Sequence, residues 1–170
     1  MKKAIILVIL LSGIAFTVFF LLKTNRKYVK RKADYAKIPS FCLQSIDNDT
    51  VTEQMLQKNI STLFVFFEPG CDLCDTEIKE INLRKNEFSA FQIVFFTLQM
   101  PETIRAYLEE IDFFPDKNMF FLADENAELY TVMEVKSSPS VFIYNSEGVL
   151  IKQFSGPVQT ETLLKYLSEK

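Results

Sequence analysis

The sequence predicts an α/β protein with a mixed central sheet flanked by helices, preceded by one N-terminal transmembrane helix. From residue 38 onward, short apolar runs typical of buried strands alternate with amphipathic stretches typical of helices. A strand–turn–strand pair and a last amphipathic stretch close the chain, an order that places a mixed sheet under covering helices. Near the N-terminus, residues 4–22 carry no charge.

The elements follow from local pattern and punctuation. Apolar runs predict strands over 41–43, 62–67, 91–97, 119–122, 140–144 and 149–154. Helical spacing predicts helices over 72–85, 101–110, 125–133 and 160–167, and Pro101 suits the first turn of its helix. Asp47-Asn48-Asp49 predicts a turn, and Asn145-Ser146-Glu147-Gly148 predicts the turn of a hairpin.

The N-terminal segment has the length and composition of a membrane span. At about 1.5 Å rise per residue, residues 4–22 reach across a hydrocarbon core of roughly 30 Å. The run is apolar on every face, which argues against a core helix, and it lacks a small-x-small site for cleavage. We therefore expect a short tail (1–3), an uncleaved anchor (4–22), a basic tether (23–37) and a folded domain (38–170).

The charge distribution excludes one class of partner. Residues 1–37 hold nine of the 19 Lys and Arg but only one of the 22 acids, so the domain itself is acidic. An acidic domain without a basic stripe is not expected to bind nucleic acid. The basic excess beside the apolar run suits anionic lipid headgroups, although its position after the run favours a cytoplasmic domain.

The absence of histidine limits the chemistry further. The chain has no histidine and three cysteines. A Ser-His-Asp triad, a Cys-His dyad and a histidine-ligated metal site are therefore impossible, and a four-cysteine zinc site cannot form. We expect neither a metal nor an organic cofactor.

Two cysteines form the motif Cys71-Asp72-Leu73-Cys74, which follows a predicted buried strand and opens a predicted helix. The N–H groups at a helix N-terminus stabilise an anion, so Cys71 is expected to be the exposed attacking thiol. Cys74, one turn further in, is expected to be buried and to resolve the mixed disulfide. A structural disulfide, an inert pair or half of a zinc site are the alternatives. The third cysteine, Cys42, is expected to be a small buried hydrophobe rather than a third redox thiol.

A second feature is Ser137-Ser138-Pro139-Ser140, which immediately precedes a predicted strand. A proline at the mouth of a central strand is restricted because it lacks an N–H group. A cis peptide bond before Pro139 in a tight turn would explain it, and a trans proline opening the strand is the alternative.

Together these residues carry a resemblance to a known superfamily. The stretch LFVFFEPGCDLC, from Leu63 to Cys74, resembles the active-site segment of the thioredoxin-like superfamily. The Ser-Pro-Ser segment resembles its cis-proline loop, and residues 142–150 resemble its terminal hairpin. With the N-terminal anchor, the resemblance is to the membrane-tethered TlpA/ResA type of thiol–disulfide oxidoreductase.

The resemblance implies roles for individual residues. Cys71 would be the nucleophile, Cys74 the resolving cysteine, and the loop at Ser138 and Pro139 would hold substrate through its backbone. Members of the family commonly reduce protein disulfides outside the cytoplasm. In peroxiredoxins, a proline and a threonine stand where this chain has Phe64 and Glu68, so peroxide reduction is not expected.

The acids around the motif suggest a direction of electron flow. Glu68 and Asp72, with Asp75, place negative charge near Cys71, which disfavours a thiolate and favours a reducing pair. We therefore expect a reductase rather than a disulfide-forming oxidase.

Protein disulfides would be its substrates, and a membrane thiol carrier or another thioredoxin-like domain would be its electron donor. Because disulfides persist outside the cytoplasm, we place the domain on the extracytoplasmic, periplasmic side. The alternative is a non-catalytic binding module in a membrane complex.

Overall fold

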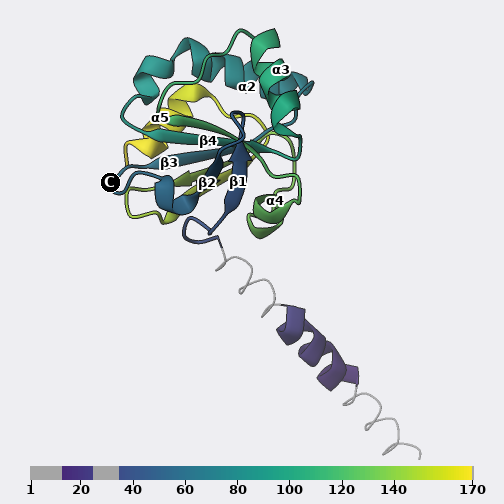
Figure 1. Ribbon diagram of the computed structural model, residues 1–170. Coiled ribbons are helices and arrows are strands. Elements are labelled where there is room, and N and C mark those ends of the chain that lie inside the picture. Colours follow the sequence, from purple (N-terminus) through teal and green to yellow (C-terminus); the bar gives the residue numbers. More distant parts are fainter. Residues whose placement is uncertain (1–12, 25–34, 170) are drawn as a thin grey trace, which may run out of the picture. The chain divides into compact units, whose positions relative to one another are not determined.

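The computed structural model describes residues 13–24 and 35–169 (Figure 1). The chain divides into two compact units, and the second begins at Tyr35. In the first unit, residues 13–24 form a helix with exposed apolar side chains that include Phe16 and Leu21. Over the two described ranges, no helix has both the length and the apolarity to cross a bilayer. The predicted tail, and parts of the predicted anchor and tether, lie outside the described residues.

The second unit is built on one seven-stranded mixed sheet, as the sequence predicts. Its strands lie in the order β2-β1-β5-β4-β3-β6-β7. The central strands β3, β4 and β5 are parallel, and every other neighbouring pair is antiparallel. Their bounds are β1 (Cys42–Ser45), β2 (Thr50–Thr52), β3 (Thr62–Phe66), β4 (Gln92–Thr97), β5 (Met119–Ala123), β6 (Ser140–Tyr144) and β7 (Leu150–Ser155).

Helices cover both faces of the sheet (Figure 1). On one face lie α2 (Asp72–Leu83), α3 (Pro101–Glu110) and α5 (Thr160–Leu167), which share a buried cluster with the sheet. The opposite face packs against α4 (Glu128–Val132) and the segment before β1. Two short 3₁₀ turns, η1 (Glu53–Met55) and η2 (Lys85–Phe88), complete the domain.

Alternation along the central strands separates the two cores. In β3, Leu63 and Val65 face the α2 side, whereas Phe64 and Phe66 face the α4 side, and all four are at most 2 % exposed. Successive side chains of a strand point to opposite faces, so a continuous apolar run fills both cores at once. Burial of both faces of β3 therefore explains why its sequence from Leu63 onward is a continuous run of apolar residues rather than an alternation of apolar and polar residues.

Cys42 corrects one of our expectations, because its side chain is exposed rather than buried. Its neighbours Phe41 and Leu43 are 5 % and 6 % exposed and belong to the core on the α4 side. Period-two alternation therefore turns Cys42 to the opposite, uncovered side of β1. The expectation treated β1 as a strand buried on both faces.

Several element bounds differ from those predicted by one to three residues, and three differences affect the description of the fold. The strand β2 was not predicted; its three residues pair with β1 and contain no apolar run. The helix α4 begins at Glu128 because Ala127, at φ +56°, interrupts a helix starting at residue 125. Residues 35–37, assigned to the tether, belong to the domain: Tyr35 is buried and Lys37 bridges Val149.

Candidate active site

The Cys-x-x-Cys motif lies where the central strand β3 passes into α2. Phe67 continues the line of β3 through a backbone hydrogen bond to Phe96, and Glu68-Pro69-Gly70 then turns the chain. Gly70 adopts a left-handed φ of +81°, which glycine tolerates without strain. The turn places Cys71 at the N-cap of α2, as predicted.

The two thiols are adjacent, and both cysteines are free. Their sulfur atoms lie 2.8 Å apart, and the backbone N–H of Cys74 donates to the Cys71 sulfur at 3.4 Å. Cys71 is half-buried, whereas Cys74 is fully buried. The prediction of a buried second thiol is therefore confirmed, whereas Cys71 is half-buried rather than exposed as predicted.

The serine-proline loop lies against the dithiol. The peptide bond between Ser138 and Pro139 is cis, as the resemblance to a cis-proline loop implies. The Ser138 hydroxyl oxygen lies 3.0 Å from the Cys74 sulfur, and the Ser138 carbonyl lies 3.9 Å from the Cys71 sulfur. Two segments separated by more than sixty residues in sequence thus meet at the sulfur atoms.

Hydroxyl groups on either side of the cis bond hold this loop in shape. The Ser140 hydroxyl donates to the Ser137 carbonyl at 2.6 Å, and the Ser137 hydroxyl donates to the Pro139 carbonyl at 3.3 Å. The backbone N–H of Gly156 also donates to the Pro139 carbonyl. The loop is therefore fixed independently of its contact with the thiols.

Burial dominates the electrostatics of the second thiol. It raises the pKa of Cys74, and the hydrogen bond with Cys71 raises it further, to about 12. The hydrogen bond from Ser138 acts in the opposite direction, as does the backbone at Glu68. A thiol with so high a pKa is almost entirely protonated at neutral pH, which suits a group that waits for a mixed disulfide.

The two acids predicted to tune the couple, Glu68 and Asp72, are both exposed. Their role stays a prediction, and solvent screens charges at such positions strongly. Asp75, on the same turn of α2, is half-buried and accepts a hydrogen bond from the Tyr107 hydroxyl at 2.7 Å. Sequence reasoning missed Tyr107, because nothing in the α3 sequence indicates which residue of α2 it meets.

A buried acid on α2 was also missed. Glu77, one helical turn after Cys74, is 3 % exposed, and burial raises its pKa to about 7. One of its oxygens accepts from the backbone N–H of Val158 at 3.0 Å, and the other has no hydrogen-bond partner in the described residues. Glu77 lies three residues after Cys74 and four before Ile81, which places it on the apolar face of the helix. This spacing is the sequence signal that could have predicted its burial.

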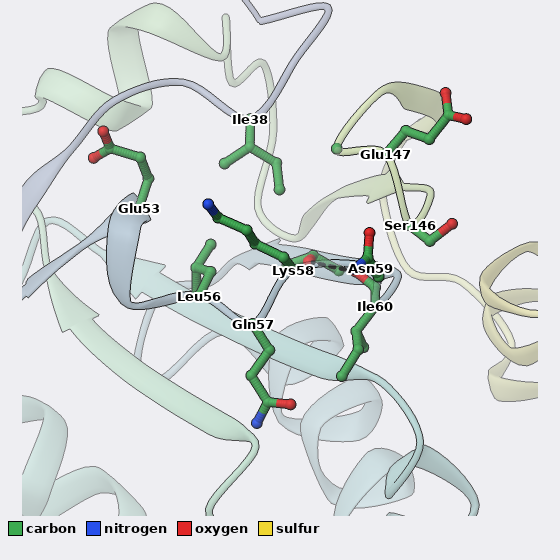
Figure 2. Close-up of a pocket in the computed structure, with 11 residues that line it drawn as sticks. Ile38, Glu53, Leu56, Gln57, Lys58, Asn59, Ile60, Ser146 and Glu147 are labelled. Carbon is green, nitrogen blue, oxygen red and sulfur yellow. Dashed lines mark hydrogen bonds between the residues drawn. The ribbon is translucent and has the colours of Figure 1, made fainter.

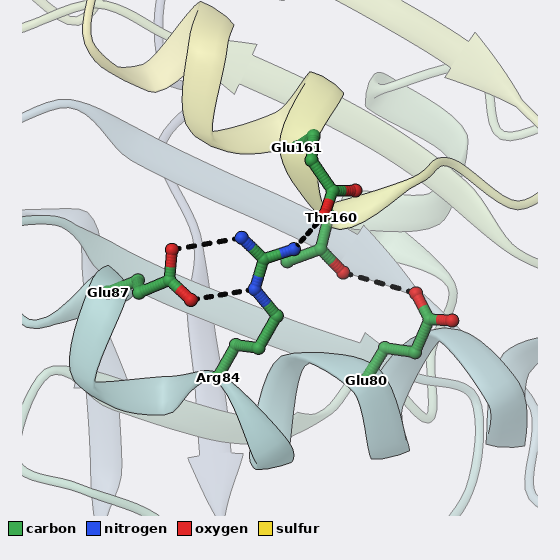
Figure 3. A network of polar contacts seen from close by, with 5 residues as sticks. All are labelled: Glu80, Arg84, Glu87, Thr160 and Glu161. Atoms are coloured by element: carbon green, nitrogen blue, oxygen red, sulfur yellow. Dashed lines mark hydrogen bonds and ion pairs between the residues drawn. The ribbon is translucent and has the colours of Figure 1, made fainter.

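The far end of α2 is tied to η2 and α5 by a polar network (Figure 3). Arg84 binds both carboxylate oxygens of Glu87, at 2.7 and 2.9 Å, and also pairs with Glu161. The Thr160 hydroxyl donates to Glu80 at 3.2 Å. These contacts fix the helix that carries both cysteines.

A pocket elsewhere in the domain is separate from the thiols. The cavity of about 290 Å³ in Figure 2 is lined by the 56–60 segment, by Glu53 and by the 146–148 turn. It also touches Thr62, the first residue of β3, whereas the dithiol follows the last. No cysteine lines it, so we do not assign it to the thiol chemistry.

Solved structures of low sequence identity share this fold. StoA from Bacillus subtilis is 18 % identical, with 77 % of this chain and 98 % of that one covered at a TM-score of 0.62. The exposed lipoprotein thioredoxin of Streptococcus pneumoniae is 19 % identical, covering 77 % and 99 % at a TM-score of 0.64. Peroxiredoxin 6 of Arenicola marina is 14 % identical, covering 76 % and 69 % at a TM-score of 0.66.

These likenesses establish a thioredoxin-like fold for the domain. No curated protein matches the sequence. The sequence model of one family does match, over residues 35–153, a span that includes the Cys-x-x-Cys turn and the cis-proline loop and most of the sheet. Because this match extends over well more than half of the sequence, the chain belongs to the AhpC/TSA family.

Proposed function

We propose that this protein is a membrane-anchored thiol–disulfide oxidoreductase whose Cys71–Cys74 dithiol reduces disulfides of proteins outside the cytoplasm. The observation that carries the proposal is the pair of free thiols, 2.8 Å apart, at the start of a helix and beside a cis-proline loop. The family match and the thioredoxin-like fold support redox chemistry at this position.

The reaction is two successive exchanges. The Cys71 thiolate attacks one sulfur of the substrate disulfide, a mixed disulfide forms, and the first substrate sulfur leaves as a thiol after taking a proton. Cys74 then attacks Cys71, the second substrate sulfur leaves, and Cys71 and Cys74 end as a disulfide. Two electrons pass from the dithiol to the substrate, and an external dithiol donor must return them.

The accessibility of the two sulfurs supports this order. Cys71 is half-buried at the N-cap, where the first N–H groups of α2 stabilise a thiolate, and it is the sulfur that a substrate can reach. Cys74 is fully buried, so a substrate disulfide does not reach its sulfur directly. The backbone of the loop at Ser138 and Pro139 lies beside both sulfurs, in a suitable place to hold an extended substrate.

Membrane anchoring rests on the N-terminal sequence. The uncharged run 4–22 has the length of a span, and the part of it that the structure describes, residues 13–22, is helical with exposed apolar side chains. We place the domain outside the cytoplasm because disulfides persist there, although the flanking positive charge favours the opposite orientation.

Peroxide reduction is the second candidate, since peroxiredoxin 6 of Arenicola marina is among the similar folds. The local sequence favours disulfide reduction instead, because Phe64 and Glu68 occupy the positions of the peroxiredoxin proline and threonine. Phe64 is fully buried in the core on the α4 side, and its side chain has no polar group that could bind a peroxide.

Turnover of a protein disulfide tests the proposal. We expect the full-length protein to reduce insulin in the presence of dithiothreitol, Cys71→Ser to abolish this activity, and Cys74→Ser to accumulate a mixed disulfide. Cys42→Ser is the matched control, and its activity should equal that of the wild type. Consumption of hydrogen peroxide without insulin reduction would favour the peroxide reading, and inactivity in both assays would favour a binding module.

A further inference from the structure

We propose that the Ser138 hydroxyl is the hydrogen-bond donor that stabilises the Cys74 thiolate during the second exchange. This role is additional to the predicted part of Ser138 in substrate binding, and it rests on the proposed function. In this role, the Ser138 side chain contacts a reacting sulfur atom directly, whereas the predicted role in substrate binding uses the backbone of the loop.

The position of Cys74 creates the need for such a donor. Its sulfur is fully buried, and β3, the strand leading to the motif, is apolar apart from Thr62 at its far end. In the described residues, the side-chain atoms within hydrogen-bonding distance of the Cys74 sulfur are the Cys71 sulfur and the Ser138 hydroxyl. A buried thiolate without a donor is strongly disfavoured.

Formation of the mixed disulfide changes which contacts remain. Once Cys71 is bonded to substrate, its sulfur carries no charge and is a weak acceptor for the Cys74 S–H group, so both of its unfavourable effects on ionisation of Cys74 are relieved. The Ser138 hydroxyl, 3.0 Å from the Cys74 sulfur, is placed to donate a hydrogen bond once Cys74 is a thiolate. Burial is then opposed by the Ser138 hydroxyl, with help from the backbone at Glu68.

The step balances without a further reactant. The Cys74 thiol gives its proton to solvent, and the Ser138 hydroxyl donates a hydrogen bond to the thiolate that forms. The thiolate attacks the Cys71 sulfur, the Cys71–Cys74 bond forms, and the bond from Cys71 to the substrate breaks. The departing substrate sulfur takes the electron pair and then a proton from solvent.

The same loop provides a matched control. The Ser137 hydroxyl contacts the Pro139 carbonyl and lies 3.5 Å from the Ser140 hydroxyl. The Ser138 hydroxyl, by contrast, contacts the Cys74 sulfur and has no partner within the described loop. Removing the Ser137 hydroxyl therefore tests the structure of the loop, whereas removing the Ser138 hydroxyl tests the thiolate contact.

The two exchanges can be measured separately with 5,5′-dithiobis(2-nitrobenzoate). In full-length protein carrying Cys42→Ser, attack by Cys71 releases a first thionitrobenzoate, and attack by Cys74 releases a second. We expect Ser138→Ala to leave the first release unchanged and to slow the second about tenfold, as for the loss of a hydrogen bond to a charged group. Ser138→Thr restores the second rate, whereas Ser137→Ala, which removes a hydroxyl of the same loop that does not contact the thiols, does not slow the second release selectively.

The pH profile supplies an independent readout. A tenfold loss of thiolate at fixed pH corresponds to a shift of about one pH unit, so the half-maximal pH of the second release rises by about one in Ser138→Ala. The proposal is overturned if the second release is equally fast in the wild type and in Ser138→Ala, or if Ser138→Ala slows both releases equally. It is also overturned if Ser138→Thr does not restore the rate of the second release. Failure of the proposed function gives a different result, because the wild type itself then releases no second thionitrobenzoate.

Discussion

The hydroxyl of Tyr107 donates a hydrogen bond to the carboxylate of Asp75 across 2.7 Å and so joins α3 to the first turn of α2. Tyr107 is 5 % exposed, and its ring lies 5.6 Å from that of Phe67, just before the motif. Burial, and then Asp75, raise the pKa of Tyr107, so the phenol remains a donor at physiological pH. The contact fixes one acid beside the thiols while Glu68 and Asp72 extend into solvent.

Removing that donor should destabilise the domain. We expect Tyr107→Phe, which retains the ring and its packing, to lower the free energy of unfolding by about 1–2 kcal/mol, because it removes a hydrogen bond to a charged group. Urea denaturation of Tyr107→Phe, Asp75→Asn and the double variant gives the coupling energy. Strictly additive losses would show that the two side chains do not interact.

The buried carboxyl of Glu77 makes stability depend on pH. Its pKa is raised by burial to about 7 in the folded protein, against 4.5 for an ordinary glutamate. The folded state therefore holds the proton more tightly, and stability is lost as the pH rises from about 4.5 to about 7. The Glu77→Gln side chain carries no charge at any of these pH values. The free energy of unfolding of Glu77→Gln minus that of the wild type should therefore increase as the pH rises from about 4.5 to about 7, by about 3 kcal/mol in total.

Denaturation of both proteins at a series of pH values measures this difference. Glu109→Gln, on the exposed side of α3, is the control and should alter stability by less than about 0.5 kcal/mol. A constant difference between Glu77→Gln and the wild type from pH 4.5 to 7 would mean that Glu77 is not buried as a titrating group.

The aromatic core on the α2 side gives a contrast between two phenylalanines. Phe121 stacks on Phe95 at a centroid distance of 4.3 Å and is 2 % exposed, whereas Phe114 is 70 % exposed. Phe121→Ala should lower the free energy of unfolding by about 3–5 kcal/mol, because it removes a large side chain and leaves a cavity. Phe114→Ala should change it by no more than about 0.5 kcal/mol in the same denaturation experiment.

Exposed Cys42 is a natural reporter of membrane orientation. In protein carrying Cys71→Ser and Cys74→Ser, Cys42 is the remaining cysteine. We expect a membrane-impermeant maleimide to label it in intact cells from which any outer envelope barrier has been removed. Labelling that appears only after the inner membrane is lysed would place the domain in the cytoplasm, as the flanking charges favour.

The sequence predicts the sheet and the thiol turn well because these depend on local patterns. The apolar run at β3, the breaking residues Pro69 and Gly70, and the following amphipathic stretch each have a recognisable period or composition. The helices α3 and α5 have the predicted bounds for the same reason.

What the sequence does not show depends on contacts between distant segments. The resemblance implies that the loop at Ser138 and Pro139 serves the dithiol, but it does not indicate that the Ser138 hydroxyl contacts Cys74. The contact of Tyr107 with Asp75 likewise joins elements more than thirty residues apart. The exposure of Cys42 is a different case, because the alternation of Phe41 and Leu43 predicts it once β1 is recognised as covered on one face.

The reduction potential of the Cys71–Cys74 couple tests the central claim most directly. Full-length protein carrying Cys42→Ser, equilibrated in thiol redox buffers, gives the fraction of disulfide at each potential. We predict a reversible two-electron couple near that of thioredoxin, about −270 mV, as expected for a reductase. A value near about −120 mV, typical of a strong oxidant, or the absence of a reversible couple between these limits, would contradict the account.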